Sequence, residues 1–104
     1  MNELSFSYNW NNKLDCKVFT TLRLNKWLKV GDKIGILLKN AFKGYGTIVG
    51  KKVLSFDKIN DWIAYLDTGY DAVECREILK KIYKNKDIDW TTQKIYYYLI
   101  RSEK

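Results

Sequence analysis

The sequence predicts an α+β fold in which about five to six strands form a curled, mixed, barrel-like sheet and two helices precede the last strand. The first half of the chain contains short segments rich in β-branched and aromatic residues, separated by turn residues. Two segments with the apolar spacing of amphipathic helices follow, and an apolar segment near the end completes the pattern. Because the helices follow the strands rather than alternating with them, α+β is favoured over a doubly wound parallel sheet.

Two strands are predicted first. Residues 4–10 alternate between apolar and polar side chains, the period of a half-buried strand, and Asn11 and Asn12 then supply a turn. Lys17–Leu24 is rich in residues that favour strands. The alternation of side chains in this second strand places Val18, Thr20, Leu22 and Leu24 on one face and Phe19, Thr21 and Arg23 on the other.

Glycines bound the next two predicted strands. Val30–Lys33 has the composition of a turn, with Gly31 free to adopt a positive φ, and leads into a strand over Ile34–Leu38. Asn40–Gly44 is predicted to turn the chain again. The strand that follows runs from Thr47 to Phe56, with a bulge or a close backbone approach at Gly50.

Two helices and a last strand complete the prediction. Asp57 is expected to cap the first helix and Gly69 to end it, whereas Asp71 and Glu74 form a capping pattern for the second. Lys94–Ile100 is apolar on both faces and is expected in the interior of the sheet. The helix residues expected to be buried are Ile59, Trp62, Ile63 and Leu66 in the first helix and Val73, Cys75, Ile78, Leu79 and Ile82 in the second.

The size and composition of the chain predict one domain over residues 1–104. Apolar residues make up 46% and aromatic residues 15% of the sequence, which is enough to build a core. Residues 1–5 carry no cationic start, and no apolar run has the length of a membrane span or a signal sequence. The sequence therefore predicts a cytoplasmic protein with no membrane partner.

Charge and cysteine content restrict the chemistry. The formal net charge is +7, which attracts polyanions, although lysine is also an ordinary solubilising residue. Cys16 and Cys75 form no CxxC motif, and the chain has no histidine, so no metal site of the usual nitrogen and sulfur kind and no cofactor are expected. Without histidine, any hydrolysis must use Lys, Thr, Glu, Asp or Tyr.

Basic and aromatic residues alternate on the predicted turns and strands of the middle of the chain. Lysine attracts a phosphate backbone, and an exposed aromatic ring stacks on unpaired bases, a combination typical of single-strand recognition. If the rings are buried, the lysines form only a solvated edge. The residues concerned are Lys39, Phe42, Lys43, Tyr45, Lys51 and Lys52.

The order and spacing of several segments resemble the ASCH family. These are the strand Lys17–Arg23, the turn Val30–Asp32 with the strand after it, the glycine-bounded strand that follows, and Asp67–Tyr70 before a helix that ends at Lys81–Tyr83. The resemblance spans about residues 17–100. It implies a PUA-like barrel with a cleft and binding of RNA or a nucleotide, and some family members hydrolyse acetylated cytidine.

The resemblance also implies catalytic candidates. Family members that hydrolyse acetylcytidine use a lysine and a threonine on the second strand and a glutamate at the start of the late helix, which here correspond to Lys17, to Thr20 or Thr21, and to Glu74. In these family members the lysine precedes the threonine by three residues, which from Lys17 selects Thr20. An arginine follows the threonine by two residues, which from Arg23 selects Thr21. A lysine of lowered pKa is a suitable base for activating a threonine hydroxyl.

Each candidate also has a structural interpretation. Threonines are common in strands, Glu74 fits a capping box, and Arg23 suits either a phosphate clamp, together with Lys17, or a surface salt bridge. The leading hypothesis is a basic cleft that binds nucleic acid, with RNA or a nucleotide as partner. The alternatives are an amidohydrolase of N-acylated cytidine-like nucleosides and a protein-interaction module, and the oligomeric state is left open.

Overall fold

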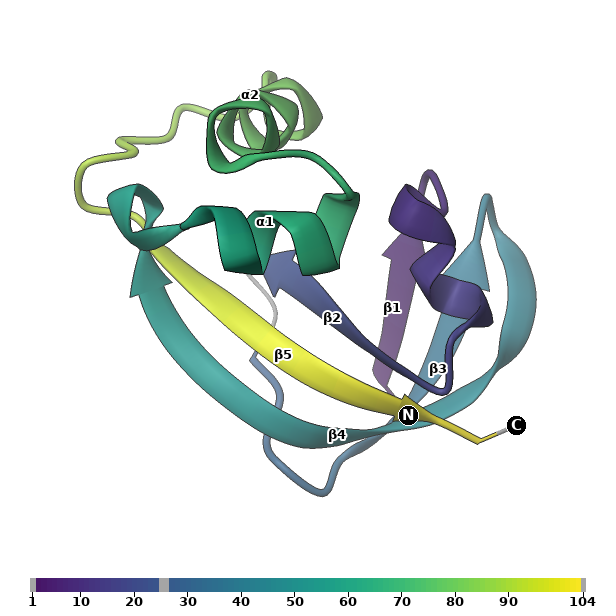
Figure 1. The fold of residues 1–104 in the computed structure, drawn as a ribbon. Coiled ribbons are helices and arrows are strands. Elements are labelled where there is room, and N and C mark those ends of the chain that lie inside the picture. The colour runs from purple at the N-terminus through teal and green to yellow at the C-terminus, as the bar shows by residue number, and fades with distance from the viewer. Residues whose placement is uncertain (1, 25–26, 104) are drawn as a thin grey trace.

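The computed structural model describes residues 2–24 and 27–103 and has the predicted order of four strands, two helices and a last strand (Figure 1). The fold is therefore α+β, as predicted. Two short 3-10 helices, η1 and η2, lie between these elements. In chain order the elements are β1 (Asn2–Phe6), η1 (Trp10–Asp15), β2 (Val18–Arg23), β3 (Lys33–Leu38), β4 (Ala41–Ser55), η2 (Phe56–Lys58), α1 (Asp61–Thr68), α2 (Ala72–Ile82) and β5 (Lys94–Ser102).

The strands form one mixed sheet in the order β1-β3-β4-β5-β2. β1 pairs with β3 in parallel, and the other neighbours are antiparallel. The long strand β4 curls strongly, but β1 and β2 are the two edges of the described sheet, so closure into a barrel is not confirmed (Figure 1). β5 lies between β4 and β2, which confirms its predicted interior position.

The hairpin between β3 and β4 turns earlier than predicted. Lys39 and Asn40 both have positive φ, at 50° and 67°, and Leu38 pairs directly with Ala41. This two-residue connection matches the twist of the flanking strands, so residues 41–44 extend β4 instead of forming a turn. The predicted bulge near Gly50 is confirmed, because the register with β5 shifts between Ile48 and Gly50.

The first strand is shorter than predicted and ends at Phe6. Asn11 and Asn12 adopt left-handed conformations within η1, at φ 57° and 52°, which asparagine tolerates better than most residues. The amide of Leu14 donates a hydrogen bond to the Asn9 side chain and stabilises this compact segment. The alternation that predicted a strand up to Trp10 therefore reflects aromatic packing outside the sheet.

The predicted buried stripe of the first helix is confirmed for Ile59, which is buried just before α1, and for Ile63, which packs against the core, but it is wrong for Trp62 and Leu66. Trp62 is 79% exposed and Leu66 is also exposed, whereas Ala64, Asp67 and Thr68 are buried. The helix begins at its cap Asn60, whose side chain accepts a hydrogen bond from the amide of Ile63, and not at Asp57. The buried face is polar because it meets a buried lysine, as described below. Gly69 ends the helix at φ 82°, as predicted.

The predicted cap of α2 is confirmed, since the Asp71 carboxylate accepts a hydrogen bond of 2.9 Å from the amide of Glu74. The buried face contains Ala72, Cys75 and Leu79, whereas the predicted members Val73 and Ile82 are exposed. Because the buried residues of α2 pack into the core cluster that they share with α1 and the sheet, its apolar stripe is narrower than its sequence pattern suggested.

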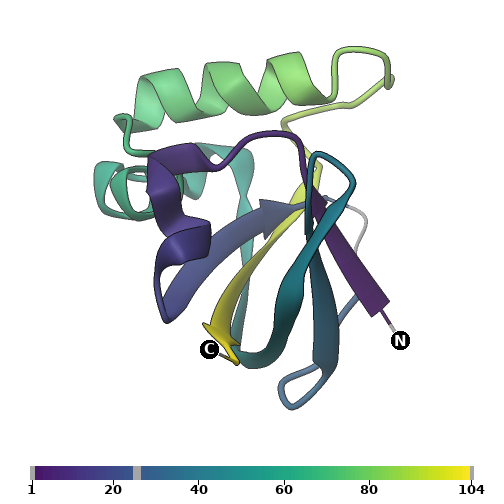
Figure 2. The same cartoon turned by 90° about the vertical axis from the view of Figure 1, so that its right-hand side faces the viewer.

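The buried core has two parts. One part fills the concave side of the curled sheet and includes Leu4, Ile34, Ile48, Tyr98 and Ile100. The other lies between the sheet and the two helices, which cover one end of the sheet in Figure 2. Neither α1 nor α2, the two α-helices among the described residues, has the length and apolar composition required to cross a membrane.

The curl of the sheet leaves no space for a side chain at Gly46. A Cβ atom there would lie 2.9 Å from Cγ2 of Ile100 and 3.2 Å from the backbone oxygen of Arg101. We expect Gly46→Ala to reduce the free energy of unfolding, measured with urea, by ~1–3 kcal/mol because of overpacking. Gly35→Ala is the matched control, since its nearest neighbours lie at 3.6 Å, and it should change stability by less than ~1 kcal/mol. Equal losses would contradict this interpretation.

Candidate functional site

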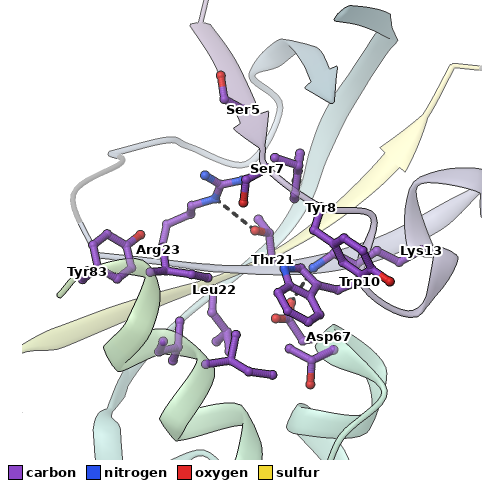
Figure 3. Close-up of a pocket in the computed structure, with 15 residues that line it drawn as sticks. Ser5, Ser7, Tyr8, Trp10, Lys13, Thr21, Leu22, Arg23, Asp67 and Tyr83 are labelled. Carbon is purple, nitrogen blue, oxygen red and sulfur yellow. Dashed lines mark hydrogen bonds and ion pairs between the residues drawn. The ribbon is translucent and has the colours of Figure 1, made fainter. Parts of the chain in front are cut away.

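A pocket lies where the two edges of the sheet approach each other, beside α1 and α2 (Figure 3). Residues of β1, the segment after it, η1, β2 and both helices line it. Its cavity volume is about 80 Å³ for the centres of water molecules, which is enough for several waters or a small polar group. The polar side chains in its wall are Ser5, Ser7, Tyr8, Lys13, Thr21, Arg23, Asp67, Thr68 and Tyr83.

A buried ion pair forms one wall of this pocket. Nζ of Lys13 lies 2.9 Å from Oδ1 of Asp67, and the two side chains are only 5% and 7% exposed. The hydroxyl of Thr20 donates a second hydrogen bond, of 3.3 Å, to the same carboxylate oxygen. Burial lowers the pKa of Lys13, and the nearby Asp67 carboxylate opposes that shift. The pair therefore fixes η1 and α1 to β2 while contributing no net charge to the pocket.

Because the charges of Lys13 and Asp67 cancel, the net positive charge of the pocket comes from Arg23. Its Nε donates a hydrogen bond of 3.0 Å to the hydroxyl of Thr21 (Figure 3). Its guanidinium carbon lies 4.5 Å from the centre of the Phe6 ring. Burial lowers the pKa of this guanidinium. No carboxylate in residues 2–24 and 27–103 forms an ion pair with Arg23, and its terminal nitrogens make no hydrogen bond there. They are therefore available to an anion.

Aromatic rings form the rim of the pocket toward the helices. Tyr8 and Trp10 have ring centres 4.6 Å apart, and Trp10 meets Tyr70 edge to face at 6.3 Å. Trp10 lines the pocket and also a neighbouring groove, which contains Tyr70 and the carboxylates of Glu74 and Glu77. The rim thus offers stacking surfaces next to a groove lined by two carboxylates and the ammonium group of Lys81, while Arg23 lies in the pocket itself.

The remaining polar groups around the Lys13–Asp67 pair are poor nucleophiles. Burial raises the pKa of the Cys75 thiol to about 11, and the Asp67 carboxylate adds to this shift. At neutral pH this thiol is protonated and inert. Burial also raises the pKa of the Tyr97 hydroxyl, against the effect of its hydrogen bond with Thr20. Of the catalytic candidates implied by the resemblance, only Thr21 lines the pocket.

The other catalytic candidates lie elsewhere. Thr20 is buried and bonded to Asp67, Lys17 is exposed before β2, and Glu74 is exposed on α2 at the neighbouring groove. The lysine and the carboxylate that the structure does bring to Thr21 are Lys13 and Asp67. Sequence reasoning missed Lys13, because a 3-10 segment has no apolar period. It also missed Asp67, although this residue follows the buried Ala64 by three positions, one helical turn.

The residues predicted to bind nucleic acid do not form one surface. Phe42 and Tyr45 are exposed and pack edge to face at 5.0 Å on the outer side of the sheet, where Lys33 lies 4.9 Å above the Tyr45 ring. Lys39 and Lys43 are also exposed on this hairpin. Lys51 and Lys52 are neighbours in β4 and therefore point to opposite faces. Only Arg23 of this set lines the pocket.

Comparisons with family models, curated proteins and solved structures find no match to this chain. The site is therefore interpreted from its own geometry. Within the part of the chain that the structure describes, no group of three or more His, Cys, Asp or Glu side chains is arranged to hold a metal ion. The geometry instead offers a small polar pocket with one unpaired guanidinium and an aromatic rim.

The Lys13–Asp67 pair should be the most sensitive interaction of the site. We expect Lys13→Met to lower the free energy of unfolding by ~3–5 kcal/mol, because it leaves a buried carboxylate without its counter-ion. Removing both charges in Lys13→Met/Asp67→Asn should restore part of the loss. Lys33→Met, which breaks the exposed Lys33–Glu103 pair, is the control and should cost less than ~1 kcal/mol in the same urea titration. If Lys13→Met and Lys33→Met reduce the free energy of unfolding equally, a structural role for the buried pair is refuted.

Proposed function

We propose that the protein binds a nucleotide, or a nucleotide segment of RNA, with its phosphate at Arg23. The observation that carries this proposal is the partly buried guanidinium in the pocket wall, which forms no salt bridge with a carboxylate among the described residues. A planar guanidinium binds phosphate oxygens in a bidentate manner. The formal net charge of +7 further favours the approach of an anionic ligand.

The distribution of charge around the pocket sets the orientation of the ligand. The phosphate lies at Arg23 and the Thr21 hydroxyl, whereas the carboxylates of Glu74 and Glu77, which would repel it, line the neighbouring groove with Lys81. The base then stacks on Tyr8 or Trp10 at the aromatic rim. In this position Glu74 and Glu77 accept hydrogen bonds from an exocyclic amino group, so adenine and cytosine are preferred to uracil.

Membership of the ASCH family and a PUA-like barrel stay predictions. They are supported by the order of elements, with two helices before the last strand, and by the strong curl of a sheet whose edges line one pocket. The binding proposal does not depend on them, because it rests on the charge, hydrogen bonding and aromatic rings of the pocket itself.

Titration with nucleotides tests the proposal. We expect Arg23→Lys to raise the Kd for adenosine monophosphate about tenfold or more, since a lysine ammonium cannot reproduce bidentate bonds to phosphate. Adenosine, which lacks the phosphate, should bind the wild type more weakly than the monophosphate. Binding is measured by calorimetry at several salt concentrations, because phosphate contacts weaken as salt rises.

The control for this titration is Arg101→Lys, which makes the same substitution at an exposed arginine on β5. Its Kd for adenosine monophosphate should equal that of the wild type. The proposal is overturned if the wild type binds adenosine and its monophosphate equally well, or if the two arginine variants have the same effect.

A second candidate function is hydrolysis of an N-acylated cytidine-like nucleoside. One observation favours it: the pocket contains a buried lysine of lowered pKa, Lys13, together with the hydroxyl of Thr21. A lysine of lowered pKa is a base of the kind that an activated threonine requires. The acid in this arrangement is Asp67 rather than Glu74. Its bond to Lys13 holds the proton on the amine and opposes this role.

Chromatography of N-acetylated cytidine incubated with the protein tests this second candidate. We expect release of cytidine by the wild type, its loss in Thr21→Val and its partial retention in Thr21→Ser, which keeps a hydroxyl at the same position. Glu74→Gln should leave kcat unchanged and alter only KM, since Glu74 lies outside the pocket that holds Lys13 and Thr21 but faces the base. No cytidine above the buffer control would exclude the hydrolase and leave the binding proposal standing.

A further inference from the structure

Lys51 lies within a cluster of aromatic side chains on the concave side of the sheet. Its Nζ is 3.6 Å from the centre of the Trp27 ring system, 5.3 Å from that of Tyr96 and 5.8 Å from that of Tyr98. Trp27 also meets Tyr96 edge to face at 5.7 Å. The sequence predicted that Lys51 contributes to nucleic-acid binding together with Phe42 and Tyr45. In the structure the aromatic residues around Lys51 are instead Trp27, Tyr96 and Tyr98.

Trp27 is the exposed member of this cluster, at 66% of its full accessible surface. Lys51 covers one face of the indole, and Tyr96 contacts it nearly at right angles. About two thirds of the Trp27 surface stays accessible, so the indole presents exposed ring surface outside these two contacts. An exposed indole face beside an ammonium group has both elements of single-strand recognition, a stacking surface for a base and a charge for a phosphate.

This cluster lies on the same face of the sheet as Arg23. Arg23 pairs with Tyr96 across β2 and β5, and Tyr96 pairs in turn with Val53 on β4, two residues after Lys51. Paired residues project from the same face of a sheet, and strands are ~4.8 Å apart, so the backbones of Arg23 and Lys51 are separated by roughly 12 Å. The side chain of Tyr96 lies between them.

We propose that Trp27 and Lys51 form a second nucleotide subsite, which takes the nucleotide adjacent to the one held at Arg23. One base stacks on the free face of Trp27, and Lys51 contacts the intervening phosphate. The ligand of the protein is then a single-stranded nucleic acid segment that runs from the pocket along Tyr96 to Trp27, rather than a free mononucleotide. This inference rests on the proposed function, because it needs the first nucleotide at Arg23.

A purely structural role is the competing explanation. The contacts of Lys51 and Tyr96 with Trp27 also hold the segment before β3 against the sheet. A structural role predicts that substitutions here change the free energy of unfolding but affect all ligands alike. The subsite predicts that they change the affinity for an oligonucleotide while the affinity for a mononucleotide is unchanged.

The experiment compares adenosine monophosphate with pentaadenylate, as RNA and as DNA, in titrations of the full chain. We expect Trp27→Ala to raise the Kd for pentaadenylate about tenfold or more, through the loss of one stacked base, and to leave the Kd for the monophosphate unchanged. Lys51→Met keeps the aliphatic contact but removes the charge, and should reduce the salt dependence of pentaadenylate binding by about one phosphate contact.

Two controls match these substitutions. Trp62→Ala removes a tryptophan of α1 that is 79% exposed, against 66% for Trp27, and Lys52→Met removes the neighbouring lysine, which points to the opposite face of β4. Both should leave the ratio of the two affinities unchanged. Urea unfolding of every variant identifies any loss of folded protein, and Lys51→Met keeps the test decisive if Trp27→Ala does not fold.

The outcomes separate the subsite from the proposed function. If the monophosphate binds in an Arg23-dependent manner but Trp27→Ala and Lys51→Met leave the preference for pentaadenylate unchanged, the second subsite is refuted and the pocket stands. If neither ligand binds the wild type, both proposals fail. If Lys51→Met and Lys52→Met change the Kd for pentaadenylate equally, the subsite is also overturned, because both lysines then act only through non-specific electrostatic attraction.

Discussion

The buried pair of Lys13 and Asp67 is the interaction on which the site depends. It joins η1 to α1 across the face of β2, and Thr20 adds a hydrogen bond from that strand. Isolated buried charges are strongly unfavourable, so each partner requires the other in place. The pair thereby fixes the positions of Trp10 and of the helix ends around the pocket. It also explains why α1 has a polar buried face while Trp62 points to solvent.

The element order could be predicted from the sequence because it follows from local patterns: β-rich segments bounded by glycine, a D-x-x-E cap and an apolar last strand. The predicted strand bounds were wrong where the conformation of single residues overrode the alternation of apolar and polar side chains. Asn11 and Asn12 in left-handed conformations end the first strand region early, and Lys39 with Asn40 forms a tight hairpin that extends β4. The predicted burial of Trp62 and Leu66 in α1 was wrong because a helix of eight residues contains too few turns to define one buried stripe when its partner is charged.

The candidate site was less predictable than the fold. Thr21 and Arg23 were identified because they share one face of a clearly patterned strand, and the pairing of that strand brings both into the pocket. Lys13 and Asp67 are 54 residues apart in sequence, and their contact depends on how η1 and α1 pack. The basic residues predicted to bind nucleic acid form no common surface. Neighbouring lysines on one strand face opposite sides, and only the pairing register shows which of them meets an aromatic cluster.

The interior position of β5 has a consequence for synthesis of the chain on the ribosome. The β2 strand, which carries Thr21 and Arg23, pairs only with β5 among the described strands, and β5 is the last to be translated. Until then β1, β3 and β4 can assemble, but β2 has no partner and the edge of β4 is uncovered. Such delayed, long-range pairing is slow and leaves nascent chains open to aggregation. The pocket thus forms only once β5 is available to pair with β2, and a nascent chain halted before β5 lacks it.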